Sequence, residues 1–263
     1  MQRGLRLLCS LALAGFLAGC GTTAAHVATA SLPASPPAHR VPAAAGPHCR
    51  SGTSRPVGST RVAVAAVVVR SRAHVFRLPG RRELASFGRL NQNGYPTVFR
   101  VLTVVRARDC RAVWYRVQLP MRPNGVTGYV AARSVEVGEV RTKIVVDISS
   151  RRLTFFRNGR RVLWATAAVG ATATPTPTGR YYVNQKLIPV DASGPFGPGA
   201  LGISAFSPVL TGWAQGGPVA IHGTNEPWSI GRPVSNGCIR VRNPVLRRLL
   251  AAAPAGTPVL IRG

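Results

Sequence analysis

The sequence predicts a mainly β protein with one short helix near its C-terminal end. Short runs of apolar or alternating residues recur along the chain and are separated by Gly, Pro or Asn, which is the pattern of strands joined by tight turns. Asn158-Gly159 stands between two such runs, and this pair favours a two-residue hairpin turn. The clearest helix signal begins at Asn243, a capping residue followed by Pro244 at the first helical position, and ends near Ala252.

Residues 1–19 predict a signal peptide rather than a part of the fold. Arg3 and Arg6 precede an apolar run, Leu7 to Leu17, that is too short to span a bilayer as a mature helix. The tetrapeptide LAGC that ends at Cys20 resembles the lipobox of bacterial lipoproteins, which implies cleavage before Cys20 and a lipid on that residue. The alternative is an ordinary secretory signal with a chance cysteine, and both alternatives export the protein.

Residues 20–60 predict a disordered tether, because they are rich in Ala, Pro, Thr, Ser and Gly. With a lipid on Cys20, such a tether would let the folded part reach away from the membrane. We therefore expect an exported protein that is lipid-anchored to the outer face of the cytoplasmic membrane, in the cell-wall zone.

A small β domain is predicted for residues 61–138. Its apolar or alternating runs, separated by turns, lie at Val62–Val69, Val98–Val105, Val113–Leu119 and Val126–Ala131. The segment from Trp114 to Val130 resembles bacterial SH3-like modules, which implies a small SH3-like β-barrel. The Trp and Tyr residues of this segment could form a ligand surface, but packing into the core is the default expectation.

A second domain is predicted for residues 141–263. Its strand candidates are Lys143–Ile148, Leu153–Arg157, Arg161–Val169, Arg180–Asn184 and Thr257–Ile261. The segment ATPTPTG at 173–179 cannot continue a β-ladder, since Pro175 and Pro177 lack N–H donors. We therefore expect a loop between the third and fourth of these strands. The helix that begins at Asn243 is expected before the last strand, Thr257–Ile261.

A histidine and a cysteine in the second domain predict its chemistry. His222 follows the apolar run Pro218–Ile221, and Cys238 lies sixteen positions later in the turn-prone segment SNGC. A thiol becomes an effective nucleophile when a neighbouring base stabilises its thiolate. The chain has neither a G-x-S-x-G elbow nor a C-x-x-C pair, so Cys/His nucleophilic chemistry is the leading hypothesis.

The segment around this pair resembles the catalytic motif of the L,D-transpeptidases, the YkuD-like family of cell-wall enzymes. The matching strings are I-H-G-T-N at 221–225, I-G-R-P-V-S at 230–235 and G-C-I-R-V at 237–241. The resemblance implies a β-sandwich-like catalytic domain over 141–263 with no cofactor, and His222 matches the family's base. Many members have Ser-His-Gly-Cys, whereas this chain has Asn236 in place of the second histidine, which weakens a role for that side chain.

The resemblance also implies a mechanism. Cys238 attacks the carbonyl between the third and fourth residues of a peptidoglycan stem peptide, and the resulting thioester passes to a diamino acid on a neighbouring stem, which gives a 3→3 cross-link. His222 acts as the base, and the backbone carbonyl of Gly223 orients its ring, because the chain offers no obvious Asp. The N–H groups of Gly237 and Cys238 are candidates for the oxyanion hole. Since the family's thiolates are acylated by carbapenems, these β-lactams are expected inhibitors.

Five residues beside the pair are candidates for substrate contacts. In an extended segment, Arg240 would lie on the same side as Cys238 and could pair with a stem-peptide carboxylate, although it could also be one more surface arginine. The others, which could hydrogen-bond the substrate or shape the two turns, are Ser235, Thr224, Asn225 and Asn236. For the first three of these we favour the turn-shaping role.

The five cysteines divide by position. Cys9 leaves with the signal peptide and Cys20 takes the lipid, so Cys49 and Cys110 remain, either as a disulfide in an exported chain or as two unrelated thiols. Cys238 is left unpaired, as a catalytic thiol requires. A zinc site is not expected, because such a site needs three or four protein ligands and no other histidine has ligand-like spacing to Cys238.

The charge balance indicates anionic partners. The chain has 34 basic and 7 acidic residues and a formal charge of +27, which favours attraction to anionic wall polymers and lipid headgroups. Nucleic acid is not expected as a partner of an exported chain whose arginines are scattered. The acidic residues are too dispersed for a carboxylate pair or a hard-metal site.

Three functions remain open. The first is transpeptidation. The second is hydrolysis through the same acyl-enzyme, as an L,D-carboxypeptidase or endopeptidase, in which water replaces the acceptor amine. The third is an inactive, lipid-tethered wall-binding protein that uses the SH3-like module, and the intact pair of His222 and Cys238 argues against it.

Overall fold

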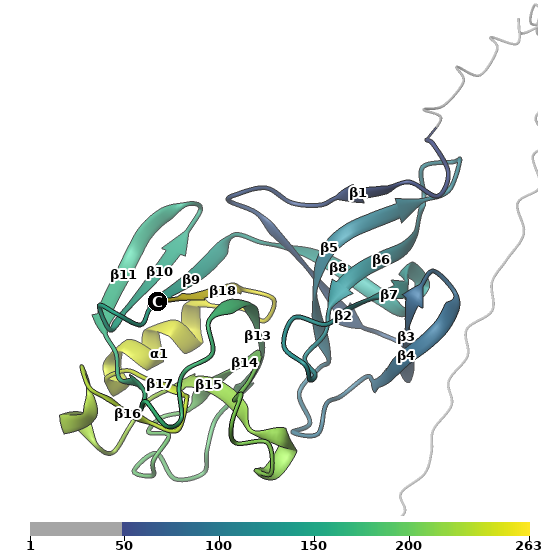
Figure 1. Cartoon of the computed structure of the whole chain (residues 1–263). Helices are drawn as coiled ribbons and strands as arrows, with labels where there is room; N and C mark the ends of the chain where they lie inside the picture. Colours follow the sequence, from purple (N-terminus) through teal and green to yellow (C-terminus); the bar gives the residue numbers. More distant parts are fainter. Residues whose placement is uncertain (1–48) are drawn as a thin grey trace, which may run out of the picture. The chain divides into compact units, whose positions relative to one another are not determined.

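The computed structural model describes residues 49–263. Two large sheets make up most of this part of the chain, and α1 (Asn243–Ala252) is the one α-helix within it (Figure 1). The predicted signal peptide, the lipidation site at Cys20 and the first part of the predicted tether lie outside the described residues. None of the described helices is long and apolar enough to cross a membrane.

The first sheet has eight strands between residues 54 and 140. They are β1 (Ser54–Pro56), β2 (Ala63–Val68), β3 (Arg72–Leu78), β4 (Arg81–Gly88), β5 (Val98–Arg106), β6 (Ala112–Gln118), β7 (Thr127–Ala131) and β8 (Val135–Val140), with the 3₁₀ helix η1 (Ala132–Ser134) before β8. The order is β4-β3-β7-β6-β5-β2-β8, with β1 on β5, and every pair is antiparallel. Alternating side chains bury Phe99 and Leu119 completely, so this sheet encloses a hydrophobic core of its own.

The four strand runs predicted for residues 61–138 are confirmed as β2, β5, β6 and β7. The sequence patterns do not predict β3, β4 or β8. The resemblance of this region to SH3-like modules stays a prediction.

Residues 54–56 belong to the first sheet and not to a tether. β1 pairs with β5 in a register that sets Ser54 opposite Val105, and a disulfide joins Cys49 to Cys110. The predicted boundary at residue 60 is therefore wrong, because a composition rich in small and polar residues does not reveal that a strand partner is available. The pairing of the two cysteines is confirmed.

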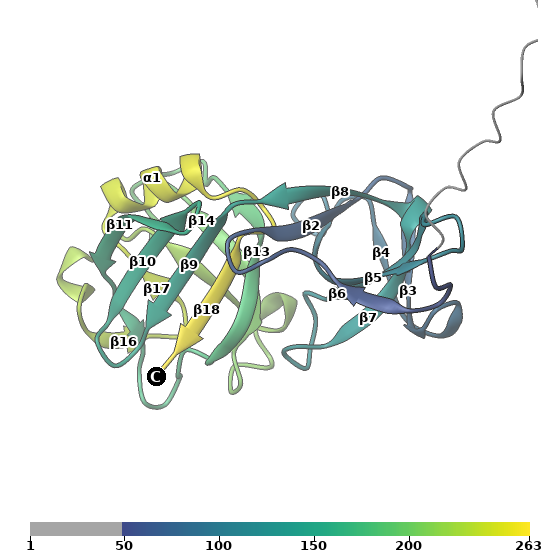
Figure 2. The same cartoon turned by 90° about the horizontal axis from the view of Figure 1, so that it is seen from above.

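The second sheet also has eight strands. They are β9 (Thr142–Asp147), β10 (Arg152–Arg157), β11 (Arg160–Thr166), β13 (Gly179–Leu187), β14 (Ala200–Phe206), β15 (Pro218–His222), β17 (Ile239–Arg240) and β18 (Pro258–Arg262). Their order is β11-β10-β9-β18-β13-β14-β15-β17, and Figure 2 shows β10, β9 and β18 side by side. The short elements beside this sheet are the strand pair β12 (Val169–Gly170) and β16 (Pro233–Ser235) and the 3₁₀ helices η2 (Ala214–Gly216) and η3 (Pro227–Ser229).

β13 joins the two halves of the second sheet. Its residues 179–182 pair with β18, and its later residues pair with β14. The fully buried Leu246 and Leu249 of α1 pack into a core that both halves share. Figure 1 shows α1 between the strands β9–β11 and the strands β14–β17. This arrangement sets β15 and β17, which carry the predicted site, at the end of a well-packed sheet.

Two local predictions have different outcomes. Asn158 and Gly159 have φ angles of 52° and 78°, as the predicted hairpin turn with two positive φ angles requires. The helix has the predicted bounds, but Asn243 does not cap it, since the capping position is Arg242 and no side chain makes a capping bond there. The side chain of Asn243 instead accepts a hydrogen bond from the N–H of Thr224, because that partner lies within reach only in the folded chain.

Hydrogen bonds join the two sheets near the start of β13. The hydroxyl of the fully buried Tyr182 lies 3.1 Å from the carbonyl oxygen of Val98 and 3.2 Å from that of Gln118. The side-chain amide of Gln118 donates to the carbonyl of Arg180 at 2.7 Å. The guanidinium of Arg122 donates to the carbonyl oxygens of Ser207 and Gly216 at 2.5 to 3.0 Å. Residues from both sheets can therefore line the same cavities.

Candidate active site

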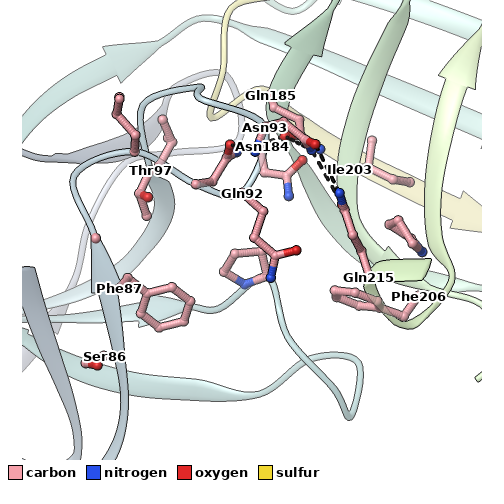
Figure 3. A pocket seen from close by; sticks show the side chains of 16 residues that line it. Ser86, Phe87, Gln92, Asn93, Thr97, Asn184, Gln185, Ile203, Phe206 and Gln215 are labelled. Carbon is pink, nitrogen blue, oxygen red and sulfur yellow. Dashed lines mark hydrogen bonds between the residues drawn. The ribbon is translucent and has the colours of Figure 1, made fainter. Parts of the chain in front are cut away.

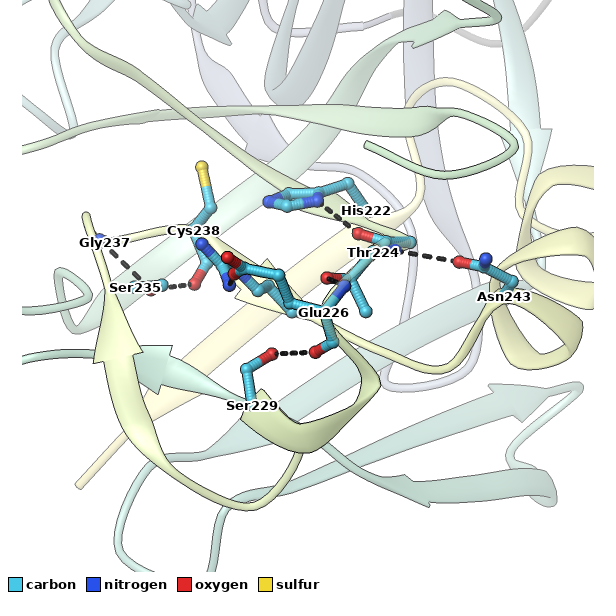
Figure 4. A network of polar contacts seen from close by, with 10 residues as sticks. His222, Thr224, Glu226, Ser229, Ser235, Gly237, Cys238 and Asn243 are labelled. Atoms are coloured by element: carbon cyan, nitrogen blue, oxygen red, sulfur yellow. Dashed lines mark hydrogen bonds and ion pairs between the residues drawn. The ribbon is translucent and has the colours of Figure 1, made fainter. Parts of the chain in front are cut away.

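β15 and β17 place the histidine and the cysteine on one face of a parallel pair. Ile221 lies opposite Ile239 in this register, so Cys238 comes opposite Ala220. Side chains alternate along a strand, and both isoleucines are fully buried in the core. Cys238 and His222 therefore face away from that core, and Figure 4 shows the sulfur and the imidazole ring together at this face.

A backbone carbonyl and an aromatic ring hold His222. Its Nδ1 donates a hydrogen bond to the carbonyl oxygen of Gly223, 2.5 Å away, since a carbonyl can only accept. This bond leaves the lone pair on Nε2, which is the tautomer that a general base needs. Phe196 packs edge-to-face on the ring with the centroids 4.9 Å apart. The predicted orienting group, the Gly223 carbonyl, thus lies where its role requires.

Only glycine fits at position 223. A Cβ atom there would lie 2.8 Å from Cδ of Pro198 and 3.0 Å from the carbonyl oxygen of Phe196, and closer still to the side-chain oxygen of Asn243. That oxygen accepts a hydrogen bond from the N–H of Thr224 at 2.8 Å (Figure 4). Asn243 therefore fixes the backbone after His222, a role that a motif ending at residue 241 does not reveal.

A tight turn presents Cys238. The hydroxyl of Ser235 donates to the carbonyl oxygen of Cys238 at 2.6 Å and accepts from the N–H of Gly237 at 3.2 Å. Gly237 has a φ of 102°, a conformation that favours glycine. The predicted oxyanion donor at Gly237 is thus already bonded inside the turn. Within residues 49–263, the N–H of Cys238 makes no backbone hydrogen bond, so it is the better placed of the two candidates.

Burial sets the protonation of the pair. Burial is the main reason that the pKa of His222 is lowered to about 4; the hydrogen bond to Gly223 opposes this shift, and the charge of Arg240 adds to it. Burial also raises the pKa of Cys238, against a hydrogen bond with the backbone of Ala220 and the charge of Arg240. Two charges in a buried site lose their hydration, so both directions favour a neutral thiol beside a neutral imidazole. The role of His222 as the base for Cys238 stays a prediction.

Arg240 has a carboxylate partner inside the chain. It lies opposite His222 in the β15–β17 register, and its Nη1 pairs with Glu226. Its Nε is buried and has no hydrogen-bond partner among the described residues. The sequence leaves two roles open for Arg240, a contact with a substrate carboxylate or one more surface arginine, and it does not predict the partner Glu226. The charge of Arg240 acts on both His222 and Cys238, since it lowers the pKa of each.

The other predicted contact residues divide into two kinds. Thr224 is buried, and its hydroxyl accepts from the N–H of Glu226 at 2.9 Å, while Ser235 is held within the cysteine turn. Both shape turns, as favoured from the sequence. Asn225 and Asn236 are exposed, and neither side chain has a hydrogen bond within residues 49–263.

A cavity of about 720 Å³ opens beside the thiol of Cys238. Its walls are mainly apolar, and Ile188, Phe196 and Trp213 remain exposed there. One cation lines it: Lys186, which donates from Nζ to the carbonyl of Leu250 at 2.6 Å and whose pKa burial lowers. A cavity of this size, with a reactive group in its wall, can hold a peptide-sized ligand.

A second cavity of about 330 Å³ adjoins the first and is lined by both sheets. The side-chain oxygen of Gln185 accepts from Asn91 at 2.8 Å and from Asn93 at 3.0 Å, and the amide of Gln215 donates to Asn93 at 3.0 Å (Figure 3). Asn93, Gln185 and Gln215 line both cavities. The loop before β5 therefore contributes a wall to the cavity that contains Cys238, which sequence analysis of separate domains does not predict.

The described residues contain no group of three His, Cys, Asp or Glu side chains that could hold a metal ion. The site consists of a partly exposed cysteine beside a buried, oriented histidine, with an apolar cavity next to them. Such a set can carry out acyl transfer through a thioester.

Comparison with known proteins finds relatives of the second sheet's part of the chain. Residues 141–261 match the YkuD family, described as the L,D-transpeptidase catalytic domain. YkuD of Bacillus subtilis strain 168, a candidate L,D-transpeptidase, is 39% identical over 119 residues, which are 45% of this chain and 64% of that protein. YkuD of Bacillus licheniformis is 37% identical over 120 residues, with the same two shares. The chain thus covers less than two thirds of the length of these relatives.

Solved structures with the same description are more distant in sequence. An L,D-transpeptidase from Mycobacterium smegmatis is 17% identical in sequence. The match covers 64% of this chain and 92% of the other chain, with a TM-score of 0.39. L,D-transpeptidase 3 from Mycobacterium tuberculosis is 19% identical, covers 54% of this chain and 76% of its own, and gives a TM-score of 0.38.

Proposed function

We propose that the protein is a peptidoglycan L,D-transpeptidase that forms 3→3 cross-links through a thioester on Cys238. The observation that carries the proposal is the β15–β17 register, which sets Cys238 and His222 on one face beside an apolar cavity. The match of residues 141–261 to the L,D-transpeptidase catalytic domain family supports it.

In the first half-reaction, the sulfur of Cys238 attacks the carbonyl between the third and fourth residues of a donor stem peptide. Nε2 of His222 takes the thiol proton during the attack, because both groups rest neutral and the Nδ1–H is committed to Gly223. The C–N bond then breaks, His222 returns the proton to the leaving amine, and a thioester remains.

In the second half-reaction, the amine of a diamino acid on a neighbouring stem attacks the thioester carbonyl. His222 takes a proton from that amine, the C–S bond breaks, and the proton returns to the sulfur. The N–H of Cys238 stabilises the oxyanion in both steps. The positive charge of Arg240 favours negative charge on the sulfur, since it lowers the pKa of Cys238.

The decisive experiment is mass spectrometry of muropeptides after incubation with the protein. Cross-linked 3→3 products that disappear with Cys238→Ala support the proposal, because this change removes the nucleophile and little volume. Shortened stems without cross-links would identify a hydrolase that uses the same pair. A carbapenem should form a one-to-one adduct with the wild type and none with Cys238→Ala, and the absence of an adduct on folded, reduced wild-type protein would contradict the proposed nucleophile.

We also propose that a lipid on Cys20 anchors the protein to the outer face of the cytoplasmic membrane. The LAGC tetrapeptide after an apolar run supports this proposal. Cys20→Ser should release the protein from the membrane fraction or block its processing. If the variant stays on membranes and high salt removes it, basic charge rather than lipid holds it there.

A further inference from the structure

A cavity remote from Cys238 is lined by cations of both sheets. It has a volume of about 240 Å³, and its basic residues are Arg61, Arg100, Arg180 and Lys143. Arg100 belongs to β5 and Arg180 to β13, and the other end of β13, at Lys186 and Leu187, lines the cavity that contains the thiol. Hydroxyl groups of Ser59, Thr60 and Thr142 complete the polar lining, and no acidic residue takes part.

The two central arginines are held close together. Gln118 lies opposite Arg100 in the β5–β6 register, and its side-chain amide donates to the carbonyl of Arg180 at 2.7 Å. Burial lowers the pKa of Arg100, and the charge of Arg180 lowers it further. Arg100 is partly buried and Arg180 is exposed. Like charges close together repel each other, and this repulsion decreases when an anion binds between them.

No carboxylate of this chain neutralises the four cations. Their side chains make no hydrogen bond, ion pair or ring contact within residues 49–263. All seven acidic residues lie in this described part, and five of them pair with a basic residue elsewhere. The other two acidic residues, Glu136 and Asp191, do not line the cavity, and residues 1–48 contain no Asp or Glu, so an anion bound there would supply the compensating charge.

A neighbouring cavity of about 180 Å³ extends the site. It shares Thr60, Arg61, Thr142 and Lys143 with the first. It adds Arg141, which already pairs with Glu139 at 2.6 Å. Two adjoining cavities that share the unpaired cations Arg61 and Lys143 fit an anion that carries more than one charge or that repeats along a chain.

We propose that this cationic cavity binds phosphate groups, in the form of a phosphate monoester or diester. A phosphate monoester carries close to two charges, and a phosphodiester polymer carries one on each repeating unit. Their acceptor oxygens match the three guanidinium groups of Arg61, Arg100 and Arg180 and the ammonium of Lys143. A single carboxylate would leave most of the cations uncompensated. The phosphate can come from a lipid headgroup or from a soluble phosphodiester polymer, and the two sources are separable by experiment.

The test measures anion binding by the full chain, with Cys20→Ser in every variant so that no acyl chain contributes. The cavity variant is Arg61→Gln with Arg180→Gln. The matched control is Arg77→Gln with Arg247→Gln, which removes the same charge from exposed arginines that do not line the cavity. Inorganic phosphate and acetate are titrated by calorimetry at constant ionic strength, set with sodium chloride.

Phosphate should bind to the wild type and the control with similar affinity and more tightly than acetate. The cavity variant should lose about tenfold or more in phosphate affinity, since charge-assisted hydrogen bonds are removed. Equal phosphate affinity in the cavity and control variants, or no preference of the wild type for phosphate over acetate, would overturn the proposal.

Two further arms identify the source. Sedimentation with phosphatidylglycerol vesicles tests a lipid headgroup, and gel shift with soluble poly(glycerol phosphate) tests a phosphodiester polymer. Loss of binding in the cavity variant but not in the control, in either arm, supports the proposal and names that source. Equal losses in both variants, in both arms, would attribute the binding to net charge and contradict a defined site.

Discussion

The side-chain oxygen of Asn243 accepts a hydrogen bond from the N–H of Thr224 at 2.8 Å, which ties the first turn of α1 to the segment that carries His222. Asn243→Ala would leave that N–H without its partner at a buried residue. We expect the free energy of unfolding to fall by about 1–3 kcal/mol and carbapenem acylation to slow. Chemical denaturation and stopped-flow acylation measure the two effects. Asn225→Ala, at an exposed position without such a bond, should change neither, and an equal effect there would contradict the assignment.

Stability should depend on pH through His222. Its pKa of about 4 in the folded protein lies below its ordinary value of 6.5, so the unfolded chain binds the extra proton first as the pH falls. The part of the free energy of unfolding that comes from His222 is fully present above pH 6.5. It decreases by roughly 3 kcal/mol as the pH falls from 6.5 to 4. Denaturation from pH 7 to 4 should show this decrease, and His222→Gln should reduce it. An unchanged slope in that variant would mean that other groups cause the decrease.

The rate of acylation should follow the same pKa. A base that stays neutral down to about pH 4 keeps its lone pair through the mildly acidic range. We expect the acid limb of the carbapenem acylation rate below pH 5, and not near 6.5 as for an exposed histidine. A limb centred near 6.5 would show that the imidazole is more hydrated than its burial indicates.

Arg240→Gln should make the thiol less reactive at neutral pH. Removal of this charge raises the pKa of Cys238, since Arg240 lowers it. Alkylation by iodoacetamide, followed from pH 7 to 10, should shift its midpoint upward. Arg232→Gln is the matched control, because that arginine stacks on Trp228 in the same loop with its guanidinium carbon 5.8 Å from the ring centre. Identical midpoints for Arg240→Gln and the wild type would remove Arg240 from the electrostatics of the site.

Tyr182→Phe should destabilise the contact between the sheets. The change removes a buried hydroxyl that serves two carbonyl oxygens, and the unsatisfied carbonyls cost about 1–3 kcal/mol. Tyr181→Phe is the matched control, since the hydroxyl of Tyr181 donates to the carbonyl oxygen of Thr178, which directly precedes β13 in the second sheet. Thermal unfolding should show a larger decrease in Tm for Tyr182→Phe. A larger decrease for the control would contradict the role of Tyr182 at the junction.

Loss of the disulfide should affect stability and not chemistry. Cys49 and Cys110 are separated by 61 positions, and closing a loop of this length stabilises the folded state by about 4 kcal/mol in the chain-entropy estimate. The double change Cys49→Ser with Cys110→Ser should lower Tm while the carbapenem adduct on Cys238 still forms in the folded fraction. A folded double variant that is not acylated would link the disulfide to the active site.

Patterns that act over a few residues could be predicted from the sequence. The turn at Asn158-Gly159 and the bounds of α1 follow from local φ preferences and from the position of Pro244. The motif around His222 and Cys238 located the site, and the Gly223 carbonyl lies one residue from the base that it orients. Each of these depends on residues that are close in the chain.

Contacts over long sequence distances could not be predicted in this way. Asn243 looks like a helix cap until Thr224, nineteen residues earlier, comes within hydrogen-bond distance. The lowered pKa of His222 and the raised pKa of Cys238 follow from burial, which no local pattern reports. β14 is buried along nearly its whole length, so it lacks the alternation that marks a strand with one wet face.

Cutting the chain at residue 141 would remove more than a neighbouring sheet. The phenol of Tyr182 would lose both of its acceptors, and the cavity that contains Cys238 would lose the wall supplied by Asn93. A truncated chain would keep Cys238 and His222, but the cavity beside them would have a different shape. Acylation rates of Cys238 measured on such a fragment would then describe a more open cavity than that of the intact chain. The first sheet is in this sense part of the site's own wall.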